Sequence, residues 1–427
     1  MKRVALVAAH FPPSNLAAVH RTRLWAQHLN EFGWQPIIVT THWRHYEEEL
    51  DWDLVSLVDS SLEIIRTKAL PTRPIRLVGD IGIRGFWWHY QALQKLAALS
   101  AIDFIHITVP SNFSAPLGRL VYERHHIPYG IDYIDPWIHQ WPEAKVVLSK
   151  AWCSYQLGKI LEPWAVQKAS LITGVAPLYF QDVLDRNPEI RNRIITRSMP
   201  YGSSAKDFEQ VGTKRQLPTL FDPNDGRFHL VYAGALLPKA QLVLDRLLEA
   251  LGILKENRPD LMSRLRLHFI GTGRSATDKA GYQVLPRAIN CGVGAAVSEH
   301  PHRMSYADVL THLIHASGIV ILGSTEPHYT PSKVFQAIQA RRPIFALLHQ
   351  ASTAHKVIAE SGAGLSIRLL DGEIPPADLI AEHLVEFVTT AWEPHKFTAE
   401  IENGPNSARH SAEVLASGLN EALALSR

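Results

Sequence analysis

The sequence is poor in cysteine, has no long hydrophobic run and shows almost no excess of either charge. Its two cysteines, Cys153 and Cys291, stand far apart among 427 residues, which excludes a disulfide framework and favours a reducing compartment. A membrane-spanning helix needs about 18 or more consecutive apolar residues, and no run of that length occurs. The formal net charge of +2 is too balanced for a protein that binds duplex nucleic acid.

Metal ligands and a cleaved leader are not indicated either. Histidine is abundant, at 22 residues, but segments such as "EHPHRM" and "HWRH" add no further carboxylate or cysteine at a spacing typical of metal ligands. We therefore expect no metal and no cofactor. The N-terminal stretch "MKRVALVAAHFPP" has a short apolar run over residues 4–9, which we interpret as a first buried strand rather than as a signal peptide.

The sequence does contain a regular alternation of short apolar segments with amphipathic ones. Segments typical of buried strands are "RVALVAAH", "QPIIVTTH", "LEIIRT", "FIHITV", "YGIDYI" and "LITGVA". Between them, "AVHRTRLWAQHLNEFGW", with Gly33 as its stop, and "APLGRLVYERHH" have the apolar spacing of helices. This alternation predicts an α/β fold with an open parallel sheet.

The alternation stops at residues 200–226 and then starts again. The interrupting segment is rich in glycine, proline and charge, so we interpret it as a linker. Beyond it, "FHLVYAG", "LRLHFIGTG", "GIVILG" and "PIFALL" predict the strands of a second sheet. We therefore expect two Rossmann-like doubly wound domains, over residues 1–215 and 226–392, facing across a cleft. Residues 393–427 end in a helix that we expect to pack back on the N-terminal domain.

Four stretches, in this order and spacing, carry a family resemblance. They are "HFPPSNLAAVHRTRLWAQHLNEFGWQPIIVTTHW", "DFIHITVPSNFSAPLGRLVYERHHIPYGIDYIDPW", "LVYAGALLPKAQLVLDRLLEAL" and "EPHYTPSKVFQAIQARRPIFAL". Together they resemble the GT-B glycosyltransferases, and among these the family 4-like group of bacterial glycosyltransferases (group 1 type). The resemblance implies that the N-terminal domain takes the acceptor and that the second domain binds a nucleotide sugar.

The fourth stretch is where this family wraps the pyrophosphate and ribose of the donor. The resemblance implies that Lys333 and Ser332, at the start of a helix, meet the diphosphate, and we expect the Lys333 ammonium to be exposed there. Relatives often place two glutamates eight apart, of which Glu326 alone is present. Gln336 stands where many relatives hold the ribose with a carboxylate. A lysine that merely reaches to solvent from a helix start is the structural alternative.

Other stretches of the second domain supply further expected donor contacts. In "YAGALLPK" the family's arginine position reads Ala235, which leaves a lysine as the diphosphate partner. The "GTG" turn allows the backbone to approach a nucleotide, although a lone Gly-x-Gly is a weak signal. The loop before "YADVLTHLIHA" is where relatives hold the base. The expected donor-binding residues in these stretches are Gly234, Lys239, Gly271, Gly273 and Arg303.

Candidate acceptor and sugar residues come from the N-terminal domain. The loop "FPPSNLAAVH" contains no consecutive glycines, which the family usually has there, and offers Ser14 and Asn15 instead. Asp135, in "IDYIDPW", aligns with the family's acidic or histidine residue beside the donor sugar and the incoming hydroxyl. For each candidate, a local hydrogen bond or core packing is the structural alternative. The further acceptor or sugar candidates are His106, Asp132 and Trp137.

A basic and aromatic segment, "TKALPTRPIRLVGDIGIRGFWWHYQ", follows the third expected strand. Its charged and aromatic residues suit an anionic membrane surface or a lipid-linked pyrophosphate acceptor, and a solvated loop with two core tryptophans explains them equally well. The residues concerned are Lys68, Arg73, Arg76, Arg84, Trp87 and Trp88.

The resemblance therefore implies a metal-independent, retaining glycosyltransferase. It would move a sugar from a nucleoside diphosphate to a glycan or lipid-linked hydroxyl in bacterial cell-surface glycan biosynthesis. We expect it in the cytoplasm, with peripheral association at the inner face of the cell membrane as an option, and with no nucleic acid partner. Asp135, Lys333 and Glu326 would be catalytic. Two alternatives stay open: a GT-B-fold nucleotide-sugar epimerase, and a non-catalytic partner subunit, for which Ala235 and Gln336 would be typical.

Overall fold

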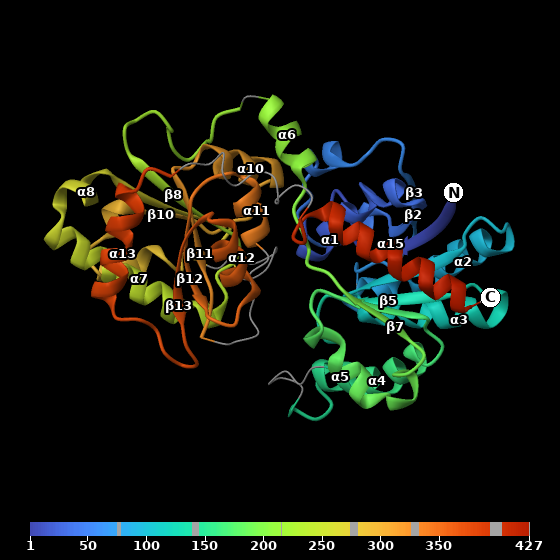
Figure 1. Cartoon of the computed structure of the whole chain (residues 1–427). Coiled ribbons are helices and arrows are strands. Elements are labelled where there is room, and N and C mark those ends of the chain that lie inside the picture. Colours follow the sequence, from blue (N-terminus) through green and yellow to red (C-terminus); the bar gives the residue numbers. More distant parts are fainter. Residues whose placement is uncertain are drawn as a thin grey trace. The chain divides into compact units, whose positions relative to one another are not determined.

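The computed structural model describes residues 1–74, 78–138, 145–214, 216–273, 281–325, 333–392 and 404–426. The chain divides into two compact units (Figure 1). The first unit consists of Met1–Gly202 and Ala408–Arg427, and the second of Ser203–Ser407. Ser203 and Ser407 form an isolated parallel bridge, so the second unit begins and ends at the same place.

The first unit is built on a seven-stranded parallel sheet with the order β3-β2-β1-β4-β5-β6-β7. Val7 pairs with both Val39 and Ile107, so the carboxyl ends of β1, β2 and β4 lie at one edge of the sheet. The strands are β1 (Lys2–Val7), β2 (Trp34–Thr41), β3 (Glu63–Thr67), β4 (Phe104–Val109), β5 (Tyr129–Tyr133), β6 (Leu171–Gly174) and β7 (Ile195–Ser198).

Helices cover this sheet. Two of them begin at capping residues that the sequence supplies: Asp80 accepts from the Ile83 N–H, and Ser149 accepts from the Trp152 N–H. The helices are α1 (Ala17–Ala26), α2 (Ile81–Ala98), α3 (Pro116–His125), α4 (Lys150–Val166), α5 (Leu178–Arg186) and α15 (Ala408–Leu425). Short 3-10 turns are η1 (Leu29–Phe32), η2 (Trp43–His45), η3 (Asp53–Leu57), η4 (Asn112–Ser114) and η6 (Pro188–Ile190). The last helix, α15, packs against α1 and β7 (Figure 1).

The second unit contains a six-stranded parallel sheet with the order β10-β9-β8-β11-β12-β13. Its strands are β8 (Phe228–Ala233), β9 (Leu265–Ile270), β10 (Val297–His300), β11 (Gly318–Leu322), β12 (Ile344–His349) and β13 (Gly364–Leu369). Its helices are α6 (Ala205–Thr213), α7 (Gln241–Asn257), α8 (Pro259–Arg264), α9 (Leu285–Asn290), α10 (Tyr306–His315), α11 (Lys333–Gln339), α12 (Thr353–Ser361) and α13 (Ala377–Thr389). Turns η7 (Pro238–Ala240) and η8 (Gly294–Ala296) complete the list.

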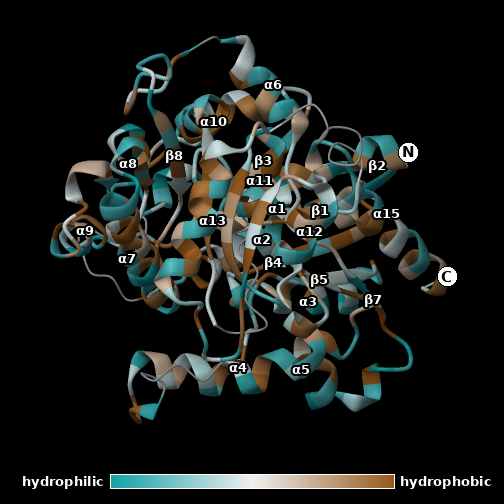
Figure 2. Cartoon of the chain, turned by 60° about the vertical axis from the view of Figure 1, so that its left-hand side comes forward, coloured by the Kyte–Doolittle hydropathy of each residue, from teal (hydrophilic) through white to brown (hydrophobic). Residues whose placement is uncertain are grey.

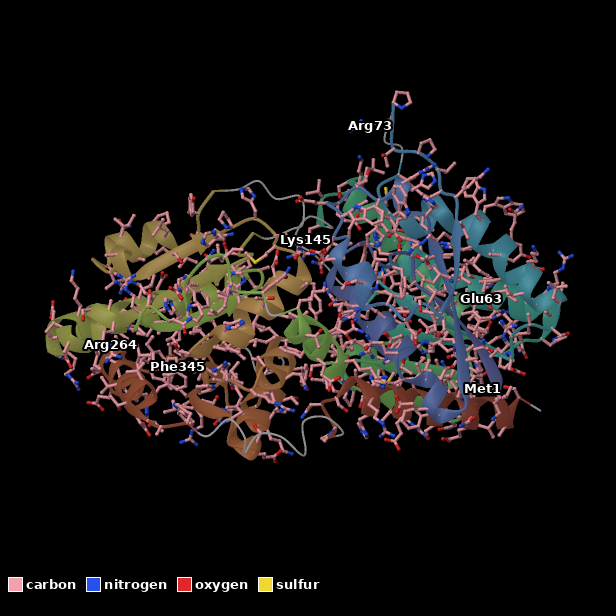
Figure 3. The ribbon with its side chains drawn as sticks, turned by 90° about the horizontal axis from the view of Figure 1, so that it is seen from above. Met1, Glu63, Arg73, Lys145, Arg264 and Phe345 are labelled. Carbon is pink, nitrogen blue, oxygen red and sulfur yellow. The ribbon has the colours of Figure 1, made fainter. Side chains whose placement is uncertain are left out.

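Both sheets are buried on both faces, which explains the apolar runs in the sequence. Along β1, Val4 and Leu6 enter one core while Ala5 and Val7 enter another, because successive side chains point to opposite faces. Phe345, labelled in Figure 3, lies in the core of the second unit. The predicted fold class, two doubly wound α/β domains with parallel sheets, is confirmed.

One feature qualifies the sequence interpretation. The stretch expected to be a linker contains α6, which begins after Ser204, whose side chain accepts from the Asp207 N–H. Within the described part of the chain, no helix combines the length and the apolar character needed to cross a membrane.

Candidate functional site

The strand order of each sheet marks one place where a ligand site is expected. In the first sheet the order reverses between β1 and β4, and in the second between β8 and β11. In open parallel sheets, ligands bind at the carboxyl ends of the strands where this reversal leaves a crevice between neighbouring loops. The loops after β1 and β4, and those after β8 and β11, are therefore the first places to examine.

In the second unit, the side chain of Lys333 lies beside the carboxyl end of β8. Its Nζ is buried and lies 3.7 Å from the centroid of the Tyr232 ring. A Cβ atom added at Gly234 would lie 3.4 Å from the same Nζ, so glycine leaves the space beside the ammonium open. Gly234 has a φ of 119°, in the region that favours glycine. The lysine, the aromatic face and the glycine thus meet at the reversal point.

Among the described residues, this lysine finds none of the partners that a buried cation normally has. No described residue offers Lys333 Nζ a hydrogen bond. Burial lowers the pKa of Lys333 from 10.5 to about 7, because an ammonium group is poorly solvated there. The expectation of an exposed ammonium is therefore wrong. Lys333 as a whole residue is half-buried, but its Nζ is enclosed against Tyr232. A site of this kind would be stabilised by an anion.

Gln336 lies on α11 three residues after Lys333, at a spacing that places two side chains on one side of a helix. Its Oε1 is buried and also finds no hydrogen-bond donor among the described residues. Buried polar atoms are almost always paired in folded proteins, so two such atoms on one helix call for an explanation. Two other candidates from this stretch, Glu326 and Ser332, lie outside the described residues.

The glycine turn after β9 approaches the same region. Gly271 has a φ of 68°, and a Cβ there would come within 4.0 Å of the Gly234 Cα. The N–H groups of Gly271 and Gly273 donate to His300 and Pro301, at 2.7 and 3.1 Å. Because these N–H groups hold the loop after β10, they cannot also donate to a nucleotide in this conformation.

A buried carboxylate that the sequence analysis missed fixes this turn. Glu299 accepts from the Thr272 hydroxyl at 2.7 Å and from the N–H groups of Gln283, Val284 and Leu285 at 2.8–2.9 Å. With four donors around it, Glu299 is fully satisfied and acts as an internal support. The two basic candidates nearby are exposed: Lys239 on η7 and Arg303 in the loop before α10.

In the first unit, two of the predicted acceptor residues are internal. Asp132 is fully buried and is held by Arg21 through two hydrogen bonds, of 2.6 and 2.8 Å. The Thr173 hydroxyl donates to the same carboxylate at 2.6 Å and lies 3.1 Å from the His106 Nε2. His106 is also fully buried, and burial lowers its pKa to about 4. Neither Asp132 nor His106 is accessible to an acceptor, because their surroundings are already filled.

The other residues of that loop differ in exposure. Trp137 is 7% exposed and packs edge-on against Phe113, with ring centroids 5.9 Å apart, so it offers no open face for a sugar ring. Asp135, directly after β5, is exposed. Burial, and after it the charge of Asp135, raises the pKa of Tyr179, so the carboxylate lies within electrostatic reach of that ring.

The loop after β1 is built around a glutamate that sequence reasoning also missed. Ser14 is fully buried and its hydroxyl donates to Glu48, while Asn15 donates to Asp51 at 2.9 Å. His10 Nδ1 lies 2.8 Å from the Glu48 carboxylate. Burial opposes ionisation of Glu48, but the adjacent His10 imidazole and Ser14 hydroxyl outweigh it and lower its pKa to about 2.

His10 follows β1 and so lies on one side of the reversal point in the first sheet. Its ring packs against that of Tyr46 at an interplanar angle of 34°, with centroids 4.8 Å apart, and its side chain is 20% exposed. On the other side, after β4, Asn112 has a buried Oδ1 with no donor among the described residues. A carboxylate beside one nitrogen of a histidine orients the ring and leaves the other nitrogen to face a ligand. No motif in the sequence distinguishes Glu48 from its neighbours in the "EEE" run.

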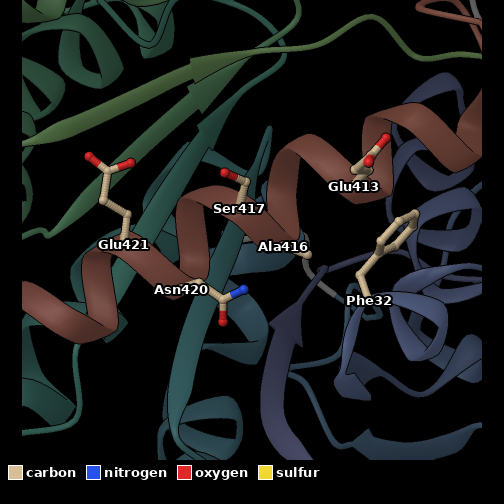
Figure 4. Close-up of a pocket in the computed structure, with 6 residues that line it drawn as sticks. All are labelled: Phe32, Glu413, Ala416, Ser417, Asn420 and Glu421. Carbon is tan, nitrogen blue, oxygen red and sulfur yellow. The ribbon is translucent and has the colours of Figure 1, made fainter.

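Two further searches point away from these places. Within the described residues, no three His, Cys, Asp or Glu side chains gather in a group that could hold a metal ion. A hollow on α15 lies against Phe32 (Figure 4), but its Asn420 accepts from Lys2 and Trp34, at the amino ends of β1 and β2. It therefore lies at the edge of the sheet opposite to the ligand-binding one.

Comparisons with known proteins give a structural result only. No protein-family model and no curated protein matches the sequence. HepE of Anabaena in complex with UDP matches with a TM-score of 0.62 and 12% identity, covering 99% of this chain and 100% of that one. The trehalose-6-phosphate synthase OtsA gives 0.61 and 13%, covering 98% and 99%. A putative UDP-N-acetylglucosamine 2-epimerase from Listeria monocytogenes gives 0.54 and 11%, covering 99% and 98%.

These likenesses define the class of fold. The two Rossmann-like parallel-sheet domains match those of GT-B glycosyltransferase structures over nearly the full length of the chain. At 11–13% identity the match concerns the fold and not the reaction.

Proposed function

We propose that this protein is a glycosyltransferase that moves a sugar from a nucleoside-diphosphate sugar to a hydroxyl acceptor. The observation that carries the proposal is the buried Lys333 ammonium beside Gly234, at the reversal point of the second sheet and without a described hydrogen-bond partner. A pyrophosphate would supply the missing negative charge. The UDP in the HepE structure and the glycosyltransferases among the fold relatives support this assignment.

The chemistry follows from where charge develops. As the bond between the anomeric carbon and the phosphate oxygen breaks, negative charge grows on the departing diphosphate, and Lys333 stabilises it. Gln336 holds the ribose through its side-chain amide, Lys239 and Arg303 add positive charge at the rim, and Asp135 orients the sugar or the acceptor. The acceptor oxygen forms the new bond to the anomeric carbon and loses its proton.

The stereochemical outcome depends on which group takes that proton. In the retaining reaction that we favour, the departing phosphate oxygen accepts it on the same face of the sugar, and no dedicated base is needed. His10, oriented by Glu48, offers a base in the first unit and thus the inverting alternative. Proton NMR of the first product anomer separates the two, and a His10→Gln variant that keeps full kcat rules out His10 as the base.

The finer assignment is part of the same proposal. We assign the protein to the family 4-like group, as a metal-independent hexosyltransferase of bacterial cell-surface polysaccharide biosynthesis. The acceptor is a glycan or a lipid-linked sugar, and the protein works in the cytoplasm at the inner face of the cell membrane. The domain limits at residues 215, 226 and 393 belong to this proposal too.

Calorimetric titration with UDP and with GDP tests the central step. We expect one of them to bind the wild-type protein, and Lys333→Met to weaken that binding at least tenfold. The matched control is Lys356→Met, in the same unit, whose Nζ makes an exposed 3.7 Å pair with Glu360. Equal binding by wild type and Lys333→Met, or no binding of either nucleotide, would contradict the proposal.

Nucleotide-sugar epimerisation is the second candidate, favoured by the putative 2-epimerase among the fold relatives. An epimerase converts UDP-N-acetylglucosamine without any acceptor, whereas a transferase leaves the sugar configuration unchanged at C2. NMR of the sugar after incubation without acceptor distinguishes the two. A non-catalytic subunit would bind neither nucleotide.

A further inference from the structure

Helix α4 and the turn before it expose an unusual number of apolar side chains. Val146, Val147 and Leu148 are 63%, 67% and 78% exposed. On the helix itself, Leu157 and Ile160 are 41% and 69% exposed. With Cys153 they follow the i, i+4, i+7 spacing that places side chains on one face of a helix. Figure 2 shows hydrophobic segments along α4 in the first unit.

This exposed face is not needed for the core of the first unit. The opposite face of α4 buries Gly158, Glu162, Ala165 and Val166, and α4 packs against α3 through its other contacts. Large exposed apolar patches are uncommon on proteins that have no partner there, because each exposed side chain forfeits hydrophobic stabilisation. The outward apolar face of α4 therefore calls for a partner.

The charges around the patch identify the kind of partner. Residues 145–161 include three lysines, Lys145, Lys150 and Lys159, and no aspartate or glutamate. All three lysines are exposed, and Lys145 is labelled in Figure 3. The next acidic residue, Glu162, is buried and paired with Arg186 at 2.8 Å. Within residues 145–161 the charged side chains beside the apolar patch are thus all lysines, although Glu143 precedes this segment in the sequence.

A lipid surface fits this combination better than a protein does. Protein interfaces are typically depleted in lysine and enriched in aromatic residues, methionine and arginine. Aliphatic side chains bordered by lysines are instead typical of segments that lie in the interface of an anionic bilayer, where the apolar groups enter the headgroup region and the lysines meet lipid phosphates.

Residues 67–91, which the sequence analysis considered for membrane binding, do not expose all of their basic side chains. Arg84 is 3% exposed and donates to the backbone oxygens of Leu70 and His45, at 3.1 and 3.0 Å. Arg76 lies outside the described residues. Trp87 is 57% exposed, and Lys68 and Arg73 are exposed as well.

We propose that the face formed by residues 145–148 with Lys150, Leu157, Lys159 and Ile160, the α4 face, binds the surface of an anionic lipid bilayer. This deepens the proposed function, because it brings the first unit, with its His10 and Asp135, to a membrane that carries lipid-linked acceptors. The binding itself requires neither donor nor acceptor, so it can be measured apart from sugar transfer.

Sedimentation of the full-length protein with vesicles tests the proposal. We expect binding to phosphatidylcholine vesicles that contain phosphatidylglycerol, little binding to phosphatidylcholine alone, and release by high salt. Replacing the three lysines with glutamine should weaken binding about fivefold per lysine. The double variant Leu157→Ser/Ile160→Ser should weaken it at least tenfold.

Matched variants keep the test specific. Leu242→Ser, at a leucine 66% exposed on α7, and Lys356→Met should bind vesicles like the wild type. Circular dichroism and nucleotide titration confirm that the α4 variants are folded and keep their donor site. The proposal is overturned if the protein binds no vesicles, or if the α4 variants bind normally while Trp87→Ser does not. It is also overturned if the protein binds vesicles equally well with and without phosphatidylglycerol. Loss of nucleotide binding alone would contradict the proposed function and not this surface.

Discussion

The two units differ in how they place buried charge beside their sheets. In the first unit, Arg21 and Asp132 satisfy each other, and Glu48 is enclosed by His10 and Ser14. In the second unit, the Lys333 ammonium contacts an aromatic face and no described carboxylate. A closed ion pair contributes to the structure of its own unit, whereas an unpaired cation is a local instability that a ligand can relieve. The comparison indicates that a ligand site is to be sought where the described residues leave a buried charge without an opposite charge.

The largest loss of stability is expected from breaking the buried ion pair between Arg21 and Asp132. Arg21→Met leaves the Asp132 carboxylate buried with one hydroxyl donor, and removing one partner of a buried pair costs about 3–5 kcal/mol. Urea unfolding measures this loss. The control Arg3→Met removes a more exposed pair, with Glu63 at 2.6 Å, and should cost less than about 1 kcal/mol. If both variants are equally stable, the pair in the first unit is not structural.

Lys333→Met should show the opposite pattern. We expect kcat for donor turnover to fall about a hundredfold, on the order of 3 kcal/mol, because an electrostatic stabiliser of the leaving group is lost. The melting temperature without nucleotide should stay the same or rise, because an uncompensated buried charge is removed. Steady-state kinetics and thermal unfolding on the same sample check both. A collapse in melting temperature with near-normal kcat would make Lys333 a structural residue.

The pH dependence sharpens the comparison. The folded-state pKa of Lys333, about 7, lies below its unfolded value of 10.5, so between these values the unfolded chain binds more protons. The burial penalty is therefore complete below pH 7 and is relieved as pH rises toward 10.5, where the protein gains stability relative to Lys333→Met. A bound diphosphate favours the ammonium, so nucleotide affinity should fall up to about tenfold per pH unit above 7. Titrations at several pH values, in buffers of different ionisation enthalpy, would detect the proton taken up, and a flat profile would refute the coupling.

Gln336→Ala should have a smaller effect, confined to donor binding. The ribose does not change its charge during the reaction, so one lost hydrogen bond, worth about 0.5–1.5 kcal/mol, should raise KM severalfold and leave kcat unchanged. Steady-state kinetics at varied donor concentration separates the two constants. A drop in kcat without a change in KM would move Gln336 from binding to chemistry.

Chelation should have no effect. Because no group of metal ligands is found among the described residues, we expect full turnover in excess EDTA. Turnover that disappears with EDTA and returns with Mn²⁺ or Mg²⁺ would show that the lysine shares its role with a metal ion.

The sequence predicted the architecture well because the fold depends on local patterns. Apolar runs such as "RVALVAAH" and "PIFALL" have to be buried on both faces, and the helices between them then impose a parallel sheet. It also placed Lys333 at the start of a helix, where α11 begins. The strands β7, β10 and β13 were missed, and they are short or irregular in their burial.

The site was predictable only in part, because pairing between distant residues leaves no local pattern. Asp132 lies in a strand buried on both faces, a place where a carboxylate needs a cation, yet its partner Arg21 stands 111 residues away. The same holds for Glu48 and His10, and for the enclosure of Lys333 by Tyr232. Residue type and position in the sequence indicated which side chains are candidates for a site. The tertiary contacts decide which of these candidates are already paired within the protein.

The parallel bridge between Ser203 and Ser407 bears on how such a protein can be rearranged. A segment whose two ends meet can be cut out or exchanged as a cassette, because its host needs only a short join across the gap. Here the host is discontinuous, and α15 reaches its place beside β7 only after the whole cassette has been made. During synthesis, the core of the first unit therefore stays open along α1 and β7 until α15 has been made.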